Sequence, residues 1–146
     1  MKIAIGCDPN ATDFKKDIIK HVESLGHEVV DYGSDDIIYA NVAIKLAKDV
    51  AAKKCDRGIL LCGTGIGMSI AANKVKGAYA ACVSNVYQAQ RATLSNNANI
   101  ITIGAFTCGI SLAKMLVTEY LKYDFDVKSS SMPKVQRIID FENKGE

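Results

Sequence analysis

The sequence lacks the features that usually mark a metal site, a nucleic-acid surface or a membrane segment. Its two histidines, His21 and His27, lie in a helical stretch and in the turn after it, so we expect no histidine-based metal site. The net charge of +2 is small, and no basic stripe indicates nucleic-acid binding. No apolar run is long enough to span a bilayer, and no charged-then-apolar leader stands at the start. We therefore expect a cytoplasmic protein with no membrane or nucleic-acid partner.

The cysteines lack the close spacing of a zinc or redox pair. There are five, at positions 7, 55, 62, 82 and 108. We expect Cys7, Cys55, Cys82 and Cys108 to be buried, reduced thiols that act as small hydrophobic side chains. Cys62 is the exception, because alternating glycines follow it.

The chain does have the length and composition of one globular domain over residues 1–146, with 49% apolar and 23% charged residues. Short apolar runs predict strands at Lys2–Gly6, Glu28–Tyr32, Gly58–Leu61, Ala78–Val83 and Ile100–Gly104. Because these runs are continuously apolar, both faces of the sheet should be covered by helices. The expected fold is α/β, a three-layer αβα sandwich around a five-stranded parallel Rossmann-like sheet.

Helical spacing of apolar residues predicts the layers around that sheet. The expected helices cover Asp13–Leu25, Tyr39–Val50, the stretch after Gly67, Tyr87–Leu94, Ile110–Lys122 and Pro133–Phe141. Asn10 or Thr12 is expected to cap the first helix. The last residues, Asn143–Glu146, have the composition of a frayed end.

The segment RGILLCGTGIGMSIAANK, residues 57–74, is the strongest candidate for a site. It indicates a buried strand that ends in Cys62, followed by Gly63, Gly65 and Gly67 and the start of a helix. Backbone N–H groups and the dipole of such a helix favour an anion. Ligands of parallel sheets also bind outside the carboxyl ends of the strands. We expect this loop to hold an oxyanion or phosphate-like group beside the thiol; the alternative is that the glycines only make a tight turn.

The loop matches neither of two common nucleotide motifs. Met68 stands where a dinucleotide fingerprint needs glycine, and no acidic residue follows at about 20 positions further on. No lysine follows Gly67, as a Walker loop requires. Neither NAD nor a nucleoside triphosphate is expected.

With these residues in hand, the chain resembles the type B ribose-5-phosphate isomerase family, which also includes galactose-6-phosphate and allose-6-phosphate isomerases. The resemblance runs from Met1 to about Tyr123. It is carried by CGTGIGMSIAANK (Cys62 to Lys74), IGCD (Ile5 to Asp8), NNANI (Asn96 to Ile100) and the pair Gly104 and Gly109.

The resemblance implies a cofactor-free aldose–ketose isomerase that acts on a sugar phosphate through a cis-enediol, with ribose 5-phosphate as the default substrate. The family's active sites lie where two subunits meet. A homodimer or homotetramer is therefore implied, with the C-terminal helix, roughly residues 131–142, packing on the partner subunit.

The resemblance also implies a role for individual residues. Cys62 would be the base that moves a proton between C1 and C2, and Thr64 would assist ring opening. Asp8 and Asn96 would hold substrate hydroxyls, with Asn96 supplied across the interface. Backbone N–H groups would bind the enediolate along the loop that includes Gly63, Gly65, Gly67 and Ser69. A thiol at a helix N-terminus ionises more readily than a free thiol, and preorganised N–H donors can supply ~3 kcal/mol to an enediolate.

Three of these residues have a purely structural alternative. Asp8 can be a helix cap or a turn residue, and Asn96 can simply form a turn. Tyr39 matches a tyrosine that precedes a helix in the family and is a substrate-binding candidate, although an aromatic on a helix's apolar face is more often part of the core.

The chain departs from the family where ring opening and phosphate binding are expected. Pro9 replaces a histidine after the first-strand aspartate, Ser95 replaces a histidine before the asparagine of the polar turn, and Phe106 replaces a phosphate-binding arginine. The C-terminal basic positions correspond to Ser130, Ser131 and Lys134.

Three explanations of these departures stay open. The substrate can be a different sugar, such as a hexose phosphate or a tetrose 4-phosphate, which cannot close a furanose ring because its O4 is esterified. A paralogous partner can supply the missing residues in a heteromer, in which this chain is a partner-dependent or non-catalytic subunit. Finally, other groups such as Lys134 or Arg91 can hold the phosphate, or the substrate has none.

Overall fold

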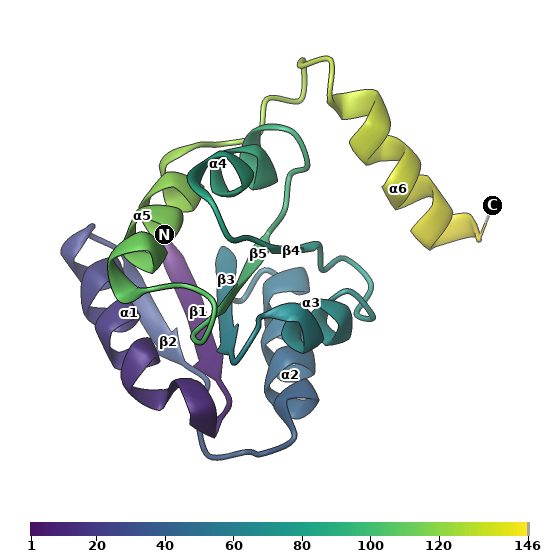
Figure 1. The fold of residues 1–146 in the computed structure, drawn as a ribbon. Helices are drawn as coiled ribbons and strands as arrows, with labels where there is room; N and C mark the ends of the chain where they lie inside the picture. The colour runs from purple at the N-terminus through teal and green to yellow at the C-terminus, as the bar shows by residue number, and fades with distance from the viewer. Residues whose placement is uncertain (146) are drawn as a thin grey trace.

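A single parallel sheet runs through the centre of the molecule in the computed structural model, which describes residues 1–145 (Figure 1). The strands are β1 (Lys2–Cys7), β2 (Glu28–Asp31), β3 (Arg57–Cys62), β4 (Ala80–Cys82) and β5 (Ile100–Gly104). They pair in the order β2-β1-β3-β5-β4, every pair parallel. The five-stranded parallel sheet that the apolar runs predict is confirmed.

Helices cover both faces of this sheet (Figure 1). One face carries α1 (Thr12–Ser24), α4 (Val86–Leu94) and α5 (Ile110–Lys122), and the other carries α2 (Tyr39–Ala51) and α3 (Ile66–Ala72). Each face has its own apolar cluster. In β3, Ile59 and Leu61 belong to one cluster and Leu60 to the other, and all three are fully buried. This two-sided burial explains why the strands are continuously apolar and confirms the αβα sandwich.

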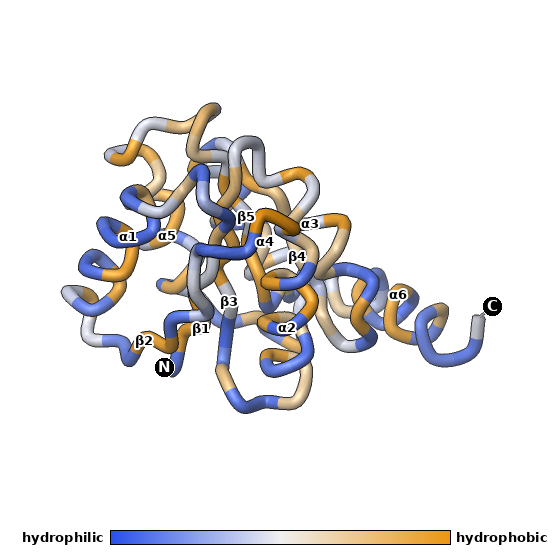
Figure 2. Tube along the Cα trace, turned by 90° about the horizontal axis from the view of Figure 1, so that it is seen from below, coloured by the Kyte–Doolittle hydropathy of each residue, from blue (hydrophilic) through white to orange (hydrophobic). Residues whose placement is uncertain are grey.

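The final helix, α6 (Met132–Lys144), lies outside the sandwich (Figure 1). Val135 is its buried residue, while Ile138 and Phe141 are exposed, and Figure 2 shows apolar and polar segments alternating along it. The helix continues to Lys144, so fraying from Asn143 onward is wrong for the described residues, and Glu146 lies outside them.

One side chain near the end of α6 ties it to the rest of the chain. The Glu142 carboxylate accepts hydrogen bonds from the Tyr79 hydroxyl at 2.8 Å and from the Gly77 amide at 3.1 Å. These bonds fix the distal part of α6 beside the turn that leads into β4.

The start of α1 differs from expectation. A 3₁₀ turn, Pro9–Ala11, precedes the helix, and Asp8 caps this turn by accepting a hydrogen bond from the Asn10 amide at 3.0 Å. No side chain caps α1 itself, so the expectation of a cap at Asn10 or Thr12 is wrong. Pro9 favours this start because its fixed φ suits the first position of a helical turn.

Across residues 1–145, no helix combines the length and the apolar character that crossing a membrane requires.

Candidate active site

The carboxyl ends of the three central strands meet at Cys62. Cys62 pairs with Gly104 of β5, and Leu61 beside it pairs with Cys7 of β1. The amide of Asp8 donates to the Leu61 carbonyl at 3.2 Å, which brings the loop after β1 to the same edge. The structure therefore places the glycine loop and Asp8 where parallel sheets bind ligands.

The loop after β3 folds back onto the Cys62 sulfur. The thiol is 6% exposed, and its Sγ accepts a hydrogen bond from the Gly65 amide at 3.1 Å. Gly65 has φ +77°, and an added Cβ would lie 3.0 Å from the Ile103 backbone, so the turn requires glycine. The sulfur and the Gly65 amide are therefore held facing each other at the end of β3.

Some backbone amides at the start of α3 donate hydrogen bonds within the helix, and others have no partner in it. The Ser69 amide donates to the Gly65 carbonyl at 3.2 Å, which is the first turn bond of the helix. The amides of Gly67 and Met68 precede that bond and have no carbonyl to pair with in the helical ladder. Gly67 and Met68 are therefore better placed to bind an anion than Ser69, whose hydroxyl donates to the Ala80 carbonyl at 3.2 Å.

Thr64 is exposed at the tip of the loop. Its Oγ1 accepts a hydrogen bond from the Ile66 amide at 3.3 Å. Since that bond uses the oxygen as an acceptor, the hydroxyl proton is available for a substrate oxygen.

Two aromatic rings border the loop. The Phe106 ring is 71% exposed, and a Cβ on Gly63 would lie 3.0 Å from it. The ring of Tyr39, the first residue of α2, would lie 2.5 Å from a Cβ on Gly67. Tyr39 is 42% exposed, so it lies beside the loop at the surface rather than in the core, and its substrate contact stays a prediction. Both glycines permit the close approach of a ring.

Two residues of β5 lie against the loop that follows Cys62. A Cβ on Gly104 would lie 2.7 Å from the Thr64 carbonyl carbon, which gives a physical reason for this glycine. The hydroxyl of Thr102 donates to the Gly65 carbonyl at 2.7 Å. The sequence reasoning missed Thr102; the available signal was one hydroxyl within an otherwise apolar strand.

Asp8 is almost fully buried at 6% exposure and is held by Asn10. Its carboxylate accepts from the Asn10 amide at 3.0 Å and from the Asn10 side chain at 3.3 Å. The capping alternative for Asp8 is therefore realised. Its substrate contact stays a prediction.

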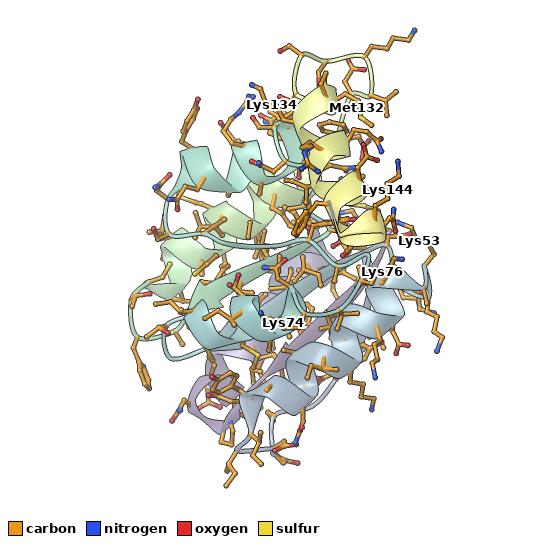
Figure 3. All side chains as sticks on the ribbon, turned by 90° about the vertical axis from the view of Figure 1, so that its right-hand side faces the viewer. Lys53, Lys74, Lys76, Met132, Lys134 and Lys144 are labelled. Carbon is orange, nitrogen blue, oxygen red and sulfur yellow. The ribbon has the colours of Figure 1, made fainter. Side chains whose placement is uncertain are left out.

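Asn96 and Lys134 are not near Cys62 within one chain. Asn96 precedes β5 and so lies at the amino end of the strands, opposite the Cys62 edge. It lines a hollow of about 250 Å³ together with Tyr79 and Ile138 of α6. Lys134 lies at the beginning of α6, outside the sandwich (Figure 3). A site that combines these residues with Cys62 needs a second copy of the chain.

The remaining cysteines separate into two groups. Cys7, Cys55 and Cys108 are buried as expected, and burial raises the pKa of Cys7 to about 11. Cys82 is exposed, so its predicted burial is wrong. It ends β4, the edge strand, where a helix covers it less completely.

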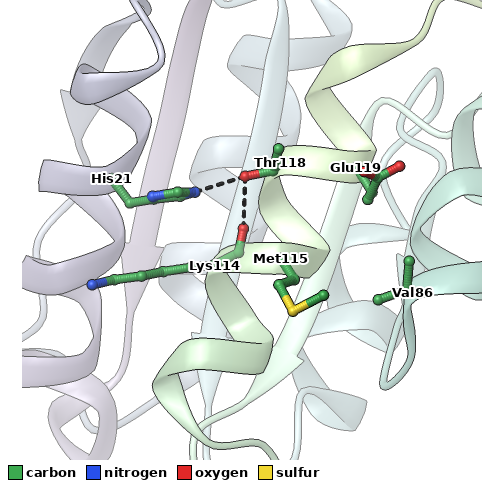
Figure 4. A pocket seen from close by; sticks show the side chains of 6 residues that line it. All are labelled: His21, Val86, Lys114, Met115, Thr118 and Glu119. Carbon is green, nitrogen blue, oxygen red and sulfur yellow. Dashed lines mark hydrogen bonds between the residues drawn. The ribbon is translucent and has the colours of Figure 1, made fainter.

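Residues of α1, α4 and α5 line a separate hollow (Figure 4). Thr118 donates to the Lys114 carbonyl at 2.9 Å, so the His21 Nε2 at 2.8 Å from the Thr118 hydroxyl acts as the donor. Burial lowers the pKa of His21, which favours this neutral imidazole. No predicted site residue lines this hollow.

Within residues 1–145, no three His, Cys, Asp or Glu side chains form a group that could hold a metal ion.

Comparison with known proteins places this geometry in a family. The family model described as ribose/galactose isomerase matches residues 3–138. The chain belongs to the ribose/galactose isomerase family. The chain is therefore an isomerase.

Relatives of this family align over nearly the whole chain. A protein of Pectobacterium atrosepticum named D-erythrulose-4-phosphate isomerase is 44% identical, with 99% of this chain and 97% of that protein covered. A Listeria innocua protein named ribose-5-P isomerase B is 42% identical, with 99% of each covered. The solved structure of Clostridium thermocellum ribose-5-phosphate isomerase B superposes with a TM-score of 0.93 at 38% identity, covering 100% of both chains.

Proposed function

We propose that this chain interconverts an aldose phosphate and its ketose, with Cys62 as the base. The observation that carries the proposal is the Cys62 thiol at the end of β3, which faces the Gly65 amide at 3.1 Å in a ribose/galactose isomerase. The base of this reaction must take a proton from one substrate carbon and return it to the next, and the Cys62 sulfur is a group that can do both.

The proton transfer itself takes place between the Cys62 loop and the substrate. The Cys62 thiolate takes the proton from C2 of the aldose, and the electron pair of that C–H bond leaves the negative charge on O1 of a cis-enediolate. The resulting enediolate is negatively charged, and the amides of Gly67 and Met68 are placed to stabilise such an anion. The O2 proton then moves to O1, and the sulfur returns its proton to C1 as the O2 oxyanion becomes the ketose carbonyl. The Thr64 hydroxyl assists by donating to a substrate oxygen.

We further propose a four-carbon sugar phosphate as the substrate. A pentose phosphate cyclises, and opening its ring calls for an acid such as histidine, whereas a tetrose 4-phosphate has no free O4 with which to close a furanose. The sequence has Pro9 and Ser95 at the two family histidine positions. The Ser95 hydroxyl is also already hydrogen-bonded, because it accepts from the Arg91 Nε at 2.6 Å. The name of the Pectobacterium relative supports this choice.

A panel of sugar phosphates tests both statements. Purified protein is incubated in deuterated water with tetrose, pentose and hexose phosphates, and exchange of the substrate C–H proton is followed by NMR. We expect kcat/KM for erythrose 4-phosphate to exceed that for ribose 5-phosphate by about tenfold or more. Cys62→Ala should abolish exchange while retaining a cooperative thermal transition. Absence of exchange with every sugar phosphate, alone and with any co-encoded paralog, would overturn the isomerase proposal.

We also propose that each site is shared between two copies of the chain. Asn96 and the start of α6 lie at the opposite end of the sheet from Cys62, so one copy would supply Cys62 and the other Asn96. Mixing the inactive variants Cys62→Ala and Asn96→Ala tests this. Random pairing should restore about a quarter of wild-type activity, because half of the dimers are mixed and one of their two sites is intact. No recovery after subunit exchange would contradict the shared site.

A second candidate is a partner-dependent subunit of a heteromeric sugar-phosphate isomerase. The observation in its favour is that Pro9, Ser95 and Phe106 carry none of the charged or acid–base groups that the family uses there. Such a subunit would show a thermal shift with sugar phosphate but no turnover. Turnover by the protein alone decides against it.

A further inference from the structure

Thr102 is a buried hydroxyl in an otherwise apolar strand. Its side chain has no solvent exposure, and its neighbours Ile101 and Ile103 are fully buried as well. A hydroxyl in such surroundings costs stability unless it is hydrogen-bonded. The Thr102 hydroxyl donates to the Gly65 carbonyl at 2.7 Å, so a residue of β5 holds the loop that follows Cys62.

This bond fixes one peptide group of the loop, the one between Gly65 and Ile66. Its carbonyl oxygen accepts from both the Thr102 hydroxyl and the Ser69 amide, the latter at 3.2 Å. Its N–H, on Ile66, donates to the Thr64 Oγ1 at 3.3 Å. The peptide group is thus held at both ends, and Thr64 is held with it.

The preceding peptide group carries the N–H that faces the base. The Gly65 amide donates to the Cys62 Sγ at 3.1 Å. Gly65 has φ +77°, in a region where glycine moves between conformations at little cost. Because both peptide groups join at the Gly65 Cα, fixing the carbonyl also keeps the amide pointed at sulfur.

We propose that Thr102 is a positioning residue for the active site: through the Gly65 carbonyl, its hydroxyl keeps the Gly65 amide on the Cys62 sulfur and keeps Thr64 beside it. The inference rests on the proposed function, since it concerns the residues proposed to transfer the proton.

Three variants separate positioning from simple stability. Thr102→Val removes the hydroxyl at nearly constant volume, and Thr102→Ser retains it. Thr93→Val is the matched control, because Thr93 is also buried, at 2% exposure, and its hydroxyl also donates to a backbone carbonyl, that of Tyr120 at 3.0 Å. That bond joins α4 to the end of α5 and does not involve the Cys62 loop.

The first measurement is the rate at which iodoacetamide alkylates Cys62 as a function of pH, read by mass spectrometry on the peptide that contains it. In Thr102→Val we expect the pH midpoint of alkylation to move upward and the rate at pH 7 to fall about tenfold, since the thiolate loses an aligned donor. The second measurement is turnover, in which kcat should fall about tenfold with a much smaller change in KM. Thr102→Ser and Thr93→Val should keep the wild-type alkylation profile.

A wild-type alkylation profile and kcat in Thr102→Val would overturn the inference, and so would an equal change in Thr93→Val. If Thr102→Val does not fold, comparing Thr102→Ala with Thr93→Ala tests the same positioning role. Alkylation needs no turnover, so its outcome is independent of the proposed function. A shifted profile in a protein that isomerises no sugar phosphate would reject the function and keep the positioning role.

Discussion

Close contacts around single glycines control the geometry of the Cys62 loop. The Tyr39 ring occupies the space that a side chain at Gly67 would need, and the Phe106 ring does the same at Gly63. Both rings are substantially exposed, so they can move aside without disturbing the core. Substitutions at these glycines should therefore change the site more than they change stability.

Gly67→Ala tests this separation. The new Cβ would displace the Tyr39 ring, which lies 2.5 Å away, while alanine in a helix gains about 0.5–1 kcal/mol over glycine. We expect a melting temperature close to that of the wild type and a several-fold rise in KM. In a Tyr39→Ala background the same substitution should have no further effect on KM. An additive rise in the double variant would show that Tyr39 is not the cause.

Phe106→Arg addresses substrate size. The exposed ring lies at the rim of the loop, so an arginine there would place a cation within reach of a phosphate on a longer sugar. The ratio of kcat/KM for ribose 5-phosphate to that for erythrose 4-phosphate should rise several-fold. Phe106→Leu serves as the uncharged control, and an equal change of the ratio in both variants would contradict a charge effect.

At the scale of elements, a partly buried ion pair connects α1 to the end of β2. The Lys15 Nζ lies 2.6 Å from the Asp31 carboxylate, and the side chain of Lys15 is only 4% exposed. Burial works to raise the pKa of Asp31, but hydrogen bonds from Lys15 and the Gly33 amide outweigh it, so the pKa is lowered from 3.8. Removing the carboxylate would leave a buried ammonium without its partner.

Asp31→Asn should accordingly destabilise the fold at neutral pH, by about 1–3 kcal/mol given that the Asp31 side chain is half exposed. Because the folded-state pKa lies below the unfolded one, the wild-type stabilisation is complete above pH 4 to 5 and is lost as pH falls through the folded-state pKa. Urea unfolding at several pH values should show a smaller acid-side loss in the variant. Asp13→Asn, which breaks the exposed Lys16–Asp13 pair, should leave stability unchanged. An equal loss in both variants would contradict a special role for the buried pair.

Most elements follow directly from local pattern. The helix predicted over Ile110–Lys122 is α5 with the same bounds, because its apolar face is regular. Strand β4 is shorter than Ala78–Val83 because an edge strand pairs on one side only. Cys62 and its glycines could likewise be predicted, because they lie together in one short segment of the sequence. The hydrogen bond of Thr102 could not be predicted from local pattern, because its partner Gly65 is 37 positions away in the sequence and only folding brings the two together.

At the scale of the whole molecule, α6 presents apolar side chains that one chain does not cover. Ile138, which lines the same hollow as Asn96, is 52% exposed, and Phe141 is 58% exposed. The sequence alone could not predict how far Asn96 and Lys134 lie from Cys62, because that depends on the strand order and on where α6 packs.

Ile138→Asp combined with Phe141→Asp should weaken self-association, because charges would replace the apolar contacts of α6. We expect a shift toward monomer in light scattering and a matching loss of activity, with the thermal transition of the sandwich retained. Met115→Asp, at a residue of α5 that is 55% exposed, is the control and should leave the assembly intact. A double variant that stays associated and active would contradict this role of α6.

For the proposed shared site, the separation of Cys62, at the end of β3, from Asn96, in the turn before β5, has a kinetic consequence. Because no hinge within residues 1–145 can bring the two ends of a parallel sheet together without breaking its strands, assembly itself would create each working centre. In dilute solution, below the dissociation constant of the dimer, the initial velocity would then grow with the square of the protein concentration rather than in proportion to it.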